Sequence, residues 1–383
     1  MRRLVFPRLS ALICAVCLLT GCAQTASPKE TVWADAQSTG SMELVYAQQF
    51  AVDYYGDDSA LITIGGTDRF LLLPAGAEPP AGLDEDIAVL QMPLNNIYLA
   101  ASSAMDHFRA LEVLDRVRLT STTAANWSLP EVVDALDNGS ILYAGRYAAP
   151  DYELVLSEQI DLAIESTMIY HSPEAGEQLQ SLGIPVMVER SSYESHPLGR
   201  MEWIKLYGLL TGKEAEATAF FDEQMAQLEP VMEAADSSDD RPTVAFFYIS
   251  SNGYANVRKP GDYISKMIEM AGGAYILADL DADDNDLSTM NMQMEAFYAA
   301  ARDADIIIYN STIDAELQTM DEFLSKSELL SGFKAVQTGN VWCTGKDMYQ
   351  QVTGLGTLLM DLHAVITGQT GDETELAFLH RLQ

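Results

Sequence analysis

The sequence predicts an α/β fold in which two parallel-sheet lobes are joined by one long α-helix. Three observations lead to this prediction. Short apolar segments alternate with amphipathic ones over residues 95–189, the same alternation returns over residues 242–366, and one helical stripe lies between them. Alternating strands and helices are typical of a parallel sheet covered by helices. We therefore expect two three-layer sandwiches with a ligand cleft between them.

The first 21 residues are expected to be an export signal and not part of the fold. Three arginines precede an apolar run over residues 11–19, and small residues then lead to a cysteine in the stretch LLTGC. This order is typical of a signal peptide, and LLTGC resembles the lipobox of bacterial lipoproteins. The resemblance implies a lipid on Cys22, with residues 22–42 as a polar tether. We expect an extracytoplasmic protein that is anchored to the cell membrane.

The charge of the chain argues against nucleic acid as a partner. The sequence has 56 acidic and 22 basic residues, a net charge of −34, whereas binding to nucleic acid depends on Lys and Arg contacts to phosphate. The same charge does little to attract anionic lipid. No second segment reaches the roughly 20 apolar residues that a membrane span needs. Membrane attachment is therefore expected through the lipid alone.

The cysteines predict a fold without an internal disulfide. Cys14 and Cys17 leave with the signal peptide, and Cys22 takes the lipid, so Cys343 is the one remaining thiol. An exported chain of this kind is held together by its hydrophobic core.

The N-terminal lobe is expected over residues 43–196. Apolar runs bounded by turn residues predict strands, and these lie at residues 50–54, 60–64, 70–73, 95–100, 140–145, 161–166 and 184–189. The helices between the later strands are predicted at residues 101–114, 128–137, 152–159 and 173–182.

The stretch RSSYESHPLGRMEW (190–203) invites two interpretations. His196 close to Glu194 suggests a general acid/base pair. Ser195 and Pro197, placed before an apolar run that ends at Gly212, instead indicate a helix start. Because no nucleophile motif accompanies the pair, we expect a structural joint that opens a helical connection over residues 197–239.

A long amphipathic helix follows within this connection. Apolar residues recur at intervals of four, three and four, which is the spacing of one helix face. They are Phe221, Met225, Leu228 and Met232. From Lys213 to Ala235 the helix would be about 35 Å long at about 1.5 Å per residue. Pro230 lies within it, so we expect a kink there.

The C-terminal lobe is expected over residues 240–383. Its strands are predicted at residues 242–250, 304–310 and 340–344, and its helices at 262–271, 292–302, 320–324 and 354–366. The acidic stretch DADDNDLS (281–288) is interpreted as a solvated loop. It lacks the central Gly and terminal Glu of an EF-hand, so whether it binds a cation stays open.

Several stretches, in this order, resemble one family of proteins: YELVLSEQIDLAIEST (152–167), SPEAGEQLQSLGIPVM (172–187), ESHPLGRMEWIKLYGLL (194–210), MEAFYAAARDADIIIYNS (294–311) and GNVWCTGK (339–346). They are similar to the extracytoplasmic solute-binding proteins of ABC importers that capture ferric siderophores, haem and cobalamin. The resemblance covers residues 85–366. It implies two lobes with one interlobe helix, a metal chelate as ligand, and an ABC permease dimer with its ATPase as partner.

The fold class itself predicts where the ligand lies. In open α/β sheets, ligands bind beyond the carboxyl ends of the strands, so candidates are residues at these ends. In the N-terminal lobe the candidates are Ser102, Ser103, Arg146, Tyr147, Met168, Tyr170 and Tyr193. In the C-terminal lobe they are Asn252, Tyr254, Arg258, Lys259, Trp342, Lys346 and Tyr349.

These residue types suit an anionic or carboxylate-bearing metal chelate. Aromatic rings offer flat apolar area, while Arg and Lys supply charge to acidic groups of the ligand. The resemblance favours a ferric siderophore, and haem or cobalamin remain alternatives. Direct ligation of iron by Tyr or His would indicate haem, but no residue singles itself out. We expect no resident cofactor and no protein metal site, and the identity of the chelate stays open.

The resemblance also implies a docking surface, since each lobe in this family presents an exposed acid to the permease. Glu174 and Glu295 stand at the matching positions, each near a predicted helix start. A capping role for either carboxylate is the structural alternative.

An anchored enzyme or a sensor is the rival class. The sequence has no GxSxG, HExxH or paired-Cys motif, and its five histidines lack metal-ligand spacing. We therefore expect a binding protein and not an enzyme, and only small opening motions about its long helix.

Overall fold

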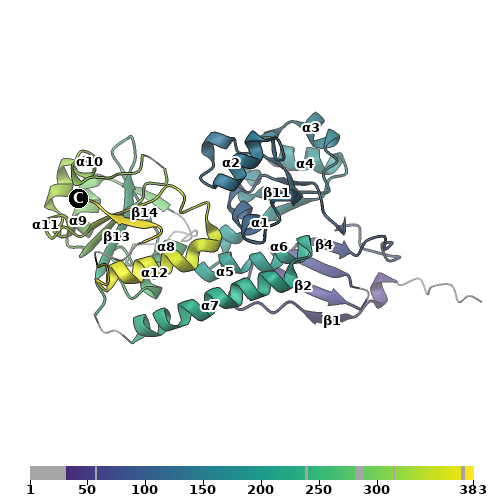
Figure 1. The fold of residues 1–383 in the computed structure, drawn as a ribbon, viewed down its shortest axis with the longest axis horizontal. Coiled ribbons are helices and arrows are strands. Elements are labelled where there is room, and N and C mark those ends of the chain that lie inside the picture. Colours follow the sequence, from purple (N-terminus) through teal and green to yellow (C-terminus); the bar gives the residue numbers. More distant parts are fainter. Residues whose placement is uncertain (1–31, 57, 238–239, 281–288, 314, 372–375) are drawn as a thin grey trace, which may run out of the picture.

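The computed structural model describes residues 32–56, 58–237, 240–280, 289–313, 315–371 and 376–383. Two α/β lobes stand side by side, with a long helix along the base beneath them and an additional sheet next to the N-terminal lobe (Figure 1). This confirms the predicted fold class. The predicted signal peptide, Cys22 and the acidic stretch 281–288 lie outside the described residues.

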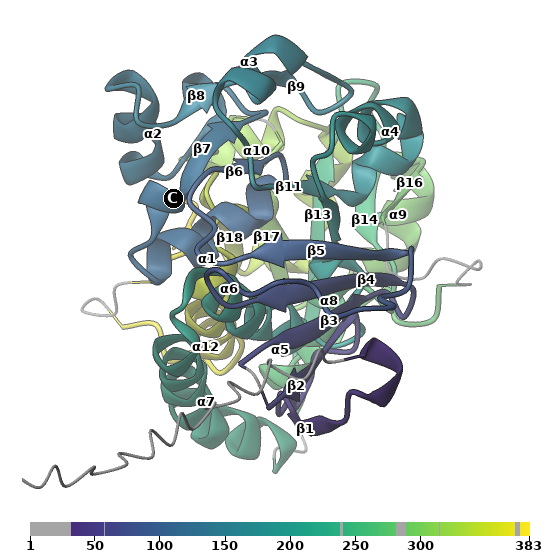
Figure 2. The same ribbon diagram turned by 90° about the vertical axis from the view of Figure 1, so that its right-hand side faces the viewer.

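The additional sheet is built from the first five strands. Its order is β1-β2-β3-β4-β5, antiparallel except for the parallel pair β4–β5. The strands are β1 (Ser38–Ser41), β2 (Phe50–Tyr55), β3 (Ala60–Ile64), β4 (Asp68–Leu73) and β5 (Ile87–Gln91). Three of these strands were predicted, but not that they form a sheet separate from the lobe sheet (Figure 2).

The sheet of the N-terminal lobe is entirely parallel, as predicted, with the order β12-β11-β6-β7-β8. Its strands are β6 (Ile97–Leu99), β7 (Val117–Thr120), β8 (Leu142–Tyr143), β11 (Leu162–Ser166) and β12 (Val186–Glu189). The helices of this lobe are α1 (Met105–Ala110), α2 (Pro130–Asp137), α3 (Tyr152–Ser157) and α4 (Pro173–Ser181). A short hairpin joins β9 (Gly145–Arg146) to β10 (Ala149–Pro150).

The sheet of the C-terminal lobe is mixed, which departs from the prediction of a parallel sheet. Its order is β16-β14-β13-β17-β18-β19, with β15 also paired to β13. β13 (Thr243–Ile249), β15 (Ala274–Tyr275), β17 (Ile306–Tyr309) and β18 (Val341–Thr344) are parallel, whereas β14 (Ala255–Arg258), β16 (Thr289–Met292) and β19 (Leu379–Arg381) are antiparallel. The helices are α8 (Tyr263–Met270), α9 (Met294–Ala301), α10 (Met320–Leu324), α11 (Lys334–Gln337) and α12 (Leu355–Ile366).

Three consecutive helices connect the lobes. They are α5 (Pro197–Glu202), α6 (Ile204–Thr211) and α7 (Glu214–Asp236). The predicted stripe of α7 is turned inward, because Phe221 and Leu228 are buried while Met225 and Met232 are half-buried. Helix α7 continues through Pro230. Gly208 permits the close packing of α6 on α7, since a Cβ at this position would collide with Ala217.

The stretch 190–203 is a joint, as expected. The carboxylate of Glu202 is fully buried and accepts the backbone N–H groups of residues 45–47, together with a bond of 2.9 Å from Nζ of Lys205. Glu194 accepts the N–H groups of residues 48 and 49 and the indole N–H of Trp203. His196 caps α5 through Nδ1. These two carboxylates attach residues 45–49 to the base of the molecule.

The hydrophobic core is continuous across the joint. Trp203 packs edge-on against Phe50 of β2, with 5.1 Å between ring centroids, and lies next to Tyr207 of α6. Tyr207 in turn contacts Phe108 of α1. The same cluster of buried residues extends to Phe247 in the C-terminal lobe. One core therefore holds the additional sheet, both lobes and the connecting helices.

Candidate ligand cleft

The carboxyl ends of β11 and β12 expose an aromatic cluster. A short 3-10 turn follows each strand, at Thr167–His171 directly after β11 and at Ser191–Tyr193 one residue after β12. These turns place Met168, Tyr170 and Tyr193 with 48%, 49% and 40% of their surface exposed. Large apolar side chains that stay this open at strand ends are the surface expected of a ligand-binding wall.

Arg190 organises this cluster, although the sequence analysis did not select it. Its Nη1 donates a hydrogen bond of 2.8 Å to the hydroxyl of Tyr170, and its Nε donates to Oε1 of Gln49. The guanidinium carbon lies 4.8 Å from the ring centroid of Tyr193. Because Arg190 directly follows β12, the rule that selected the other candidates would also have found it. A fixed cation between two open tyrosines suits an anionic ligand.

A second cluster forms in the C-terminal lobe. The guanidinium carbon of Arg258, at the end of β14, lies 5.2 Å from the ring centroid of Tyr349. The hydroxyl of Tyr349 accepts a 3.0 Å hydrogen bond from the amide of Asn310, a buried residue directly after β17 that the sequence analysis missed. Asp262 lies 3.4 Å from Arg258. Burial raises the pKa of Asp262, against the opposing effect of the Arg258 charge.

The remaining candidates of the C-terminal lobe are only partly brought together. Asn252 and Tyr254 are exposed on the turn between β13 and β14, where Tyr254 accepts a bond from Gln293. Lys259 is buried and Lys346 is exposed.

Trp342 is not at the strand ends, which corrects its selection. It lies inside β18 and is buried, and its indole N–H donates to Asn340 at 2.8 Å. Arg381 lies against its ring. The cavity beside it is lined by residues before β13 and β17, such as Pro242 and Asp305. Since Trp342 lines this cavity, it faces the amino ends of the strands. It is not at the carboxyl end of β18, because the strand continues for two more residues.

The N-terminal candidates differ in their surroundings. Arg146 is exposed on the β9–β10 hairpin, whereas Tyr147 is half-buried against the small apolar cluster of Ile169 and Val188. Ser103 donates to the buried carboxylate of Glu189. Arg146 is thus available to a ligand, while Tyr147 contributes mainly to packing.

Two pairs of hydrogen bonds cross from one lobe to the other. Oδ2 of Asp106, at the start of α1, accepts bonds of 2.8 Å from the backbone N–H and 2.5 Å from the hydroxyl of Thr353. The amide of Gln350 accepts from the backbone N–H of Ser128 and donates to the carbonyl of Asn126. These bonds hold α1 and α2 of one lobe against the segment that precedes α12 of the other.

We expect these bonds to limit movement of the lobes, so that solution scattering with and without ligand shows only a small change in radius of gyration. Replacing Thr353 by Val and Gln350 by Ala removes three of the four cross-lobe bonds, leaving only the bond from the backbone N–H of residue 353 to Asp106, and is expected to widen the ensemble. The double variant Ser325→Ala/Thr338→Ala, which removes two hydroxyls that bond only within the C-terminal lobe, is the matched control. A large closure of the unaltered protein on ligand binding would contradict this expectation.

The architecture and the strand-end clusters define the chain as a two-lobed binding protein. A family model described as periplasmic binding protein matches residues 102–348, and the chain belongs to this family. Within the described residues no group of three or more His, Cys, Asp or Glu side chains is placed to hold a metal ion. No helix in the same part of the chain is long and apolar enough to span a bilayer.

The chain is also similar to several known proteins and solved structures. Two uncharacterized lipoproteins of Methanocaldococcus jannaschii are 24% and 23% identical, over 84% and 85% of this chain and 81% and 83% of their own. A periplasmic binding protein of Veillonella parvula has a TM-score of 0.61 at 16% identity, over 81% of this chain and 98% of its own. The haem-binding protein HutB of Vibrio cholerae has a TM-score of 0.55 at 19% identity, over 69% and 98%. An ABC-type Fe3+-hydroxamate transport protein of Saccharomonospora viridis has a TM-score of 0.52 at 18% identity, over 71% and 93%.

Proposed function

We propose that this protein is the substrate-binding component of an ABC import system and captures an iron complex of the ferric siderophore type outside the membrane. The observation that carries the proposal is the pairing of an arginine with tyrosines near strand ends in both lobes: Arg190 with the open Tyr170 and Tyr193, and Arg258 with the half-buried Tyr349. Flat rings and fixed guanidinium groups suit a bulky chelate that carries negative charge. Structural relatives that bind haem or transport a ferric hydroxamate support this ligand class.

A panel of chelates tests the proposal. The purified protein is expected to melt at higher temperature in the presence of one ferric chelate, because a ligand that binds only the native state stabilises it. The panel comprises a ferric trihydroxamate, a ferric triscatecholate, haemin and cobalamin. A shift with haemin or cobalamin alone would replace the siderophore class, and no shift with any of the four would refute the proposal.

Replacing each of the two arginines tests whether the ligand binds in the proposed cleft or elsewhere on the surface. Arg190→Ala and Arg258→Ala are each expected to weaken binding of the responding chelate by about tenfold or more, a loss of about 1.4 kcal/mol or more. Arg302→Ala, which removes a half-exposed cation at the end of α9, is the matched control and leaves affinity unchanged. Fluorescence titration measures all three variants. Equal affinities for the three would place the ligand elsewhere.

We further propose that Glu174 and Glu295 dock to an ABC permease dimer and that a lipid on Cys22 holds the protein at the membrane. Both glutamates are exposed, at the start of α4 in the N-terminal lobe and of α9 in the C-terminal lobe (Figure 1). Neither side chain caps its own helix. This supports a role toward a partner.

Reversing these charges is expected to impair delivery but not capture. The double variant Glu174→Lys/Glu295→Lys should bind the chelate as tightly as the unaltered protein and lose most stimulation of the transporter ATPase in proteoliposomes. The variant Glu131→Lys/Glu328→Lys carries the same charge change at other helix starts and should retain stimulation. Full stimulation by the first variant would contradict the docking proposal.

A further inference from the structure

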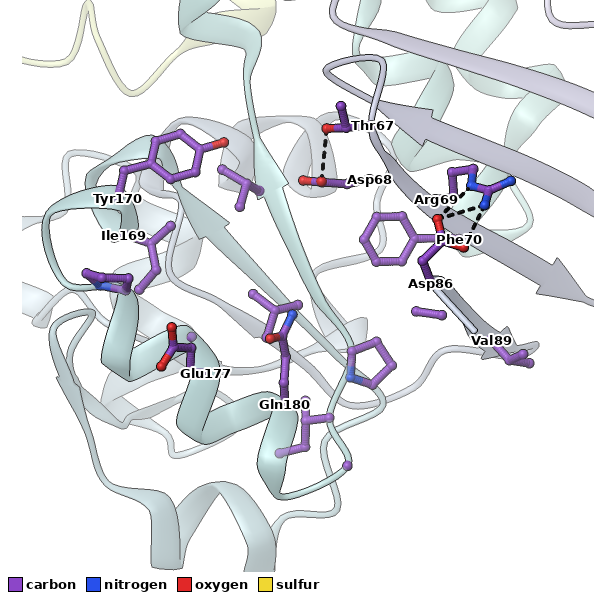
Figure 3. A pocket seen from close by; sticks show the side chains of 18 residues that line it. Thr67, Asp68, Arg69, Phe70, Asp86, Val89, Ile169, Tyr170, Glu177 and Gln180 are labelled. Atoms are coloured by element: carbon purple, nitrogen blue, oxygen red, sulfur yellow. Dashed lines mark hydrogen bonds and ion pairs between the residues drawn. The ribbon is translucent and has the colours of Figure 1, made fainter. Parts of the chain in front are cut away.

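A groove outside the cleft separates the additional sheet from the N-terminal lobe. It has a volume of about 650 Å³ and lies between β4 and β5 on one side and α4 and β12 on the other (Figure 3). Phe70 and Val89 line the first side, and Val186 and Val188 line the second. The groove is in the size range of ligand sites, and no residue proposed above for the chelate lines it except Tyr170 at its rim.

The strand beside this groove has a free edge. β12 is the last strand of its sheet and pairs only with β11. The backbone N–H of Ala163 donates to the carbonyl of Pro185 at 2.9 Å, with Ala163 in register with Val186. In a parallel ladder, residues 185 and 187 therefore bond to β11, and the N–H and C=O groups of Val186 and Val188 point away from it.

These outward groups face the groove without a backbone partner in the described chain. Neither Val186 nor Val188 forms a hydrogen bond to the additional sheet, whose nearest strand, β5, pairs only with β4. A free strand edge is a template for an added strand. At about 3.3 Å per residue, the four residues of β12 offer about 13 Å of edge.

The side chains of the groove favour a particular type of strand. The floor is apolar, since Phe70 and Val188 are almost fully buried and Val89 is half-buried. The rim carries the exposed carboxylates of Asp68 and Glu177, and among the described residues neither is in an ion pair. The one cation of the lining, Arg69, is already held by Asp84 and Asp86. An occupant would meet apolar surface below and negative charge at both sides.

We propose that this groove binds an extended basic peptide, which adds a strand to the free edge of β12. Alternate residues of such a strand point in opposite directions, so an apolar set contacts Phe70 and Val89 while a basic set reaches Asp68 and Glu177. A second copy of the chain is disfavoured as occupant, because each copy carries a net charge of −34 and the same acidic rim. Apart from Tyr170, which borders both, this binding site shares no residue with the proposed chelate site.

The test uses the full chain and three labelled hexapeptides in fluorescence anisotropy. The peptide Lys-Val-Lys-Val-Lys-Val is expected to bind. The same peptide with N-methyl groups on alternate residues, which cannot complete a strand ladder, should bind at least tenfold more weakly, and so should Glu-Val-Glu-Val-Glu-Val. No measurable binding of the first peptide at millimolar concentration would overturn the proposal. Equal binding of the N-methylated peptide would also overturn it, because binding would then not depend on pairing with the edge of β12.

Variants of the protein locate the binding to the groove. Val186→Pro removes an outward N–H that takes no part in the β11 ladder. Asp68→Lys/Glu177→Lys reverses the charge of the rim. Each variant should bind the Lys-Val peptide at least tenfold more weakly than the unaltered protein. Glu223→Lys on the exposed face of α7 is the control and keeps full affinity. Thermal unfolding checks that each variant is folded. Analytical ultracentrifugation tests for self-association. If the unaltered chain is a dimer and Val186→Pro is a monomer, the occupant of the groove is a second copy of the chain and the proposal is overturned.

Discussion

Replacing Glu202 by Ala is expected to lower the free energy of unfolding by about 3–5 kcal/mol, the usual cost of removing one partner of a buried ion pair. The carboxylate is fully buried, and its loss leaves Lys205 as an uncompensated charge that is only 5% exposed. The N–H groups of Val45, Tyr46 and Ala47 also lose their acceptor. Urea denaturation measures the effect.

Two further variants separate the cause from a general loss of packing. Glu202→Ala/Lys205→Met removes both charges and is expected to recover part of the lost stability, because no unpaired charge remains. Glu216→Ala breaks an exposed pair with Lys213 on α7 and is expected to leave the urea midpoint unchanged. If Glu202→Ala behaves like Glu216→Ala, the carboxylate does not hold the joint.

The second large effect is expected from Glu165, a carboxyl group on β11 in the core of the N-terminal lobe. Burial raises its pKa to about 8, and among the described residues neither of its oxygens has a hydrogen-bond partner. The folded state therefore keeps a proton that the unfolded chain releases near pH 4.5. The resulting stabilisation is fully present below the unfolded pKa and is lost as pH rises toward the folded pKa.

Glu165→Gln removes this dependence, since the amide is close in size and does not ionise. Between pH 5 and 8 the unfolding free energy of the unaltered protein should fall relative to that of the variant by up to about 1.4 kcal/mol per pH unit. Urea denaturation at each pH gives the two curves. Glu223→Gln, an exposed carboxylate on α7, should follow the unaltered protein. Parallel curves for Glu165→Gln and the unaltered protein would contradict a protonated buried carboxyl.

Much of the fold could be predicted because its lobes are built from local patterns. The strand predicted at residues 161–166 is β11, and the helix predicted at 320–324 is α10 with the same bounds. Both sequences carry apolar periodicity and clear boundary residues, such as Thr319, whose capping box with Glu322 starts α10. Local signals of this kind decide whether a helix or a strand forms.

Pairing between distant segments could not be predicted in this way. The strands β14 (ANVR) and β16 (TMNM) are short and contain polar residues such as Asn256 and Asn291, so they lack the apolar run of a central strand. The C-terminal sheet is mixed because β14 pairs antiparallel with β13, and β19 with β18. The separate sheet of β1–β5 likewise depends on which strands meet, and an apolar pattern identifies a strand without naming its neighbour.

The candidate site shows the same limit. Strand ends were located well enough to select Tyr170 and Tyr193, but Arg190 acquires its position from Gln49, a residue 141 positions earlier in the chain. Trp342 was selected for its residue type, while its orientation follows from the register of β18 with β19. Roles that depend on contacts between remote segments require the three-dimensional structure.

The hydrogen bonds from Asp106 to Thr353 and from Gln350 to Ser128 bear on how cargo would leave such a protein. If the lobes hardly move, closing around the ligand contributes little to affinity. No conformational strain is then stored that could help to release the ligand. Release would then follow from spontaneous dissociation or from contacts made by a docked partner. A binding protein that moves this little would not itself supply energy for transport.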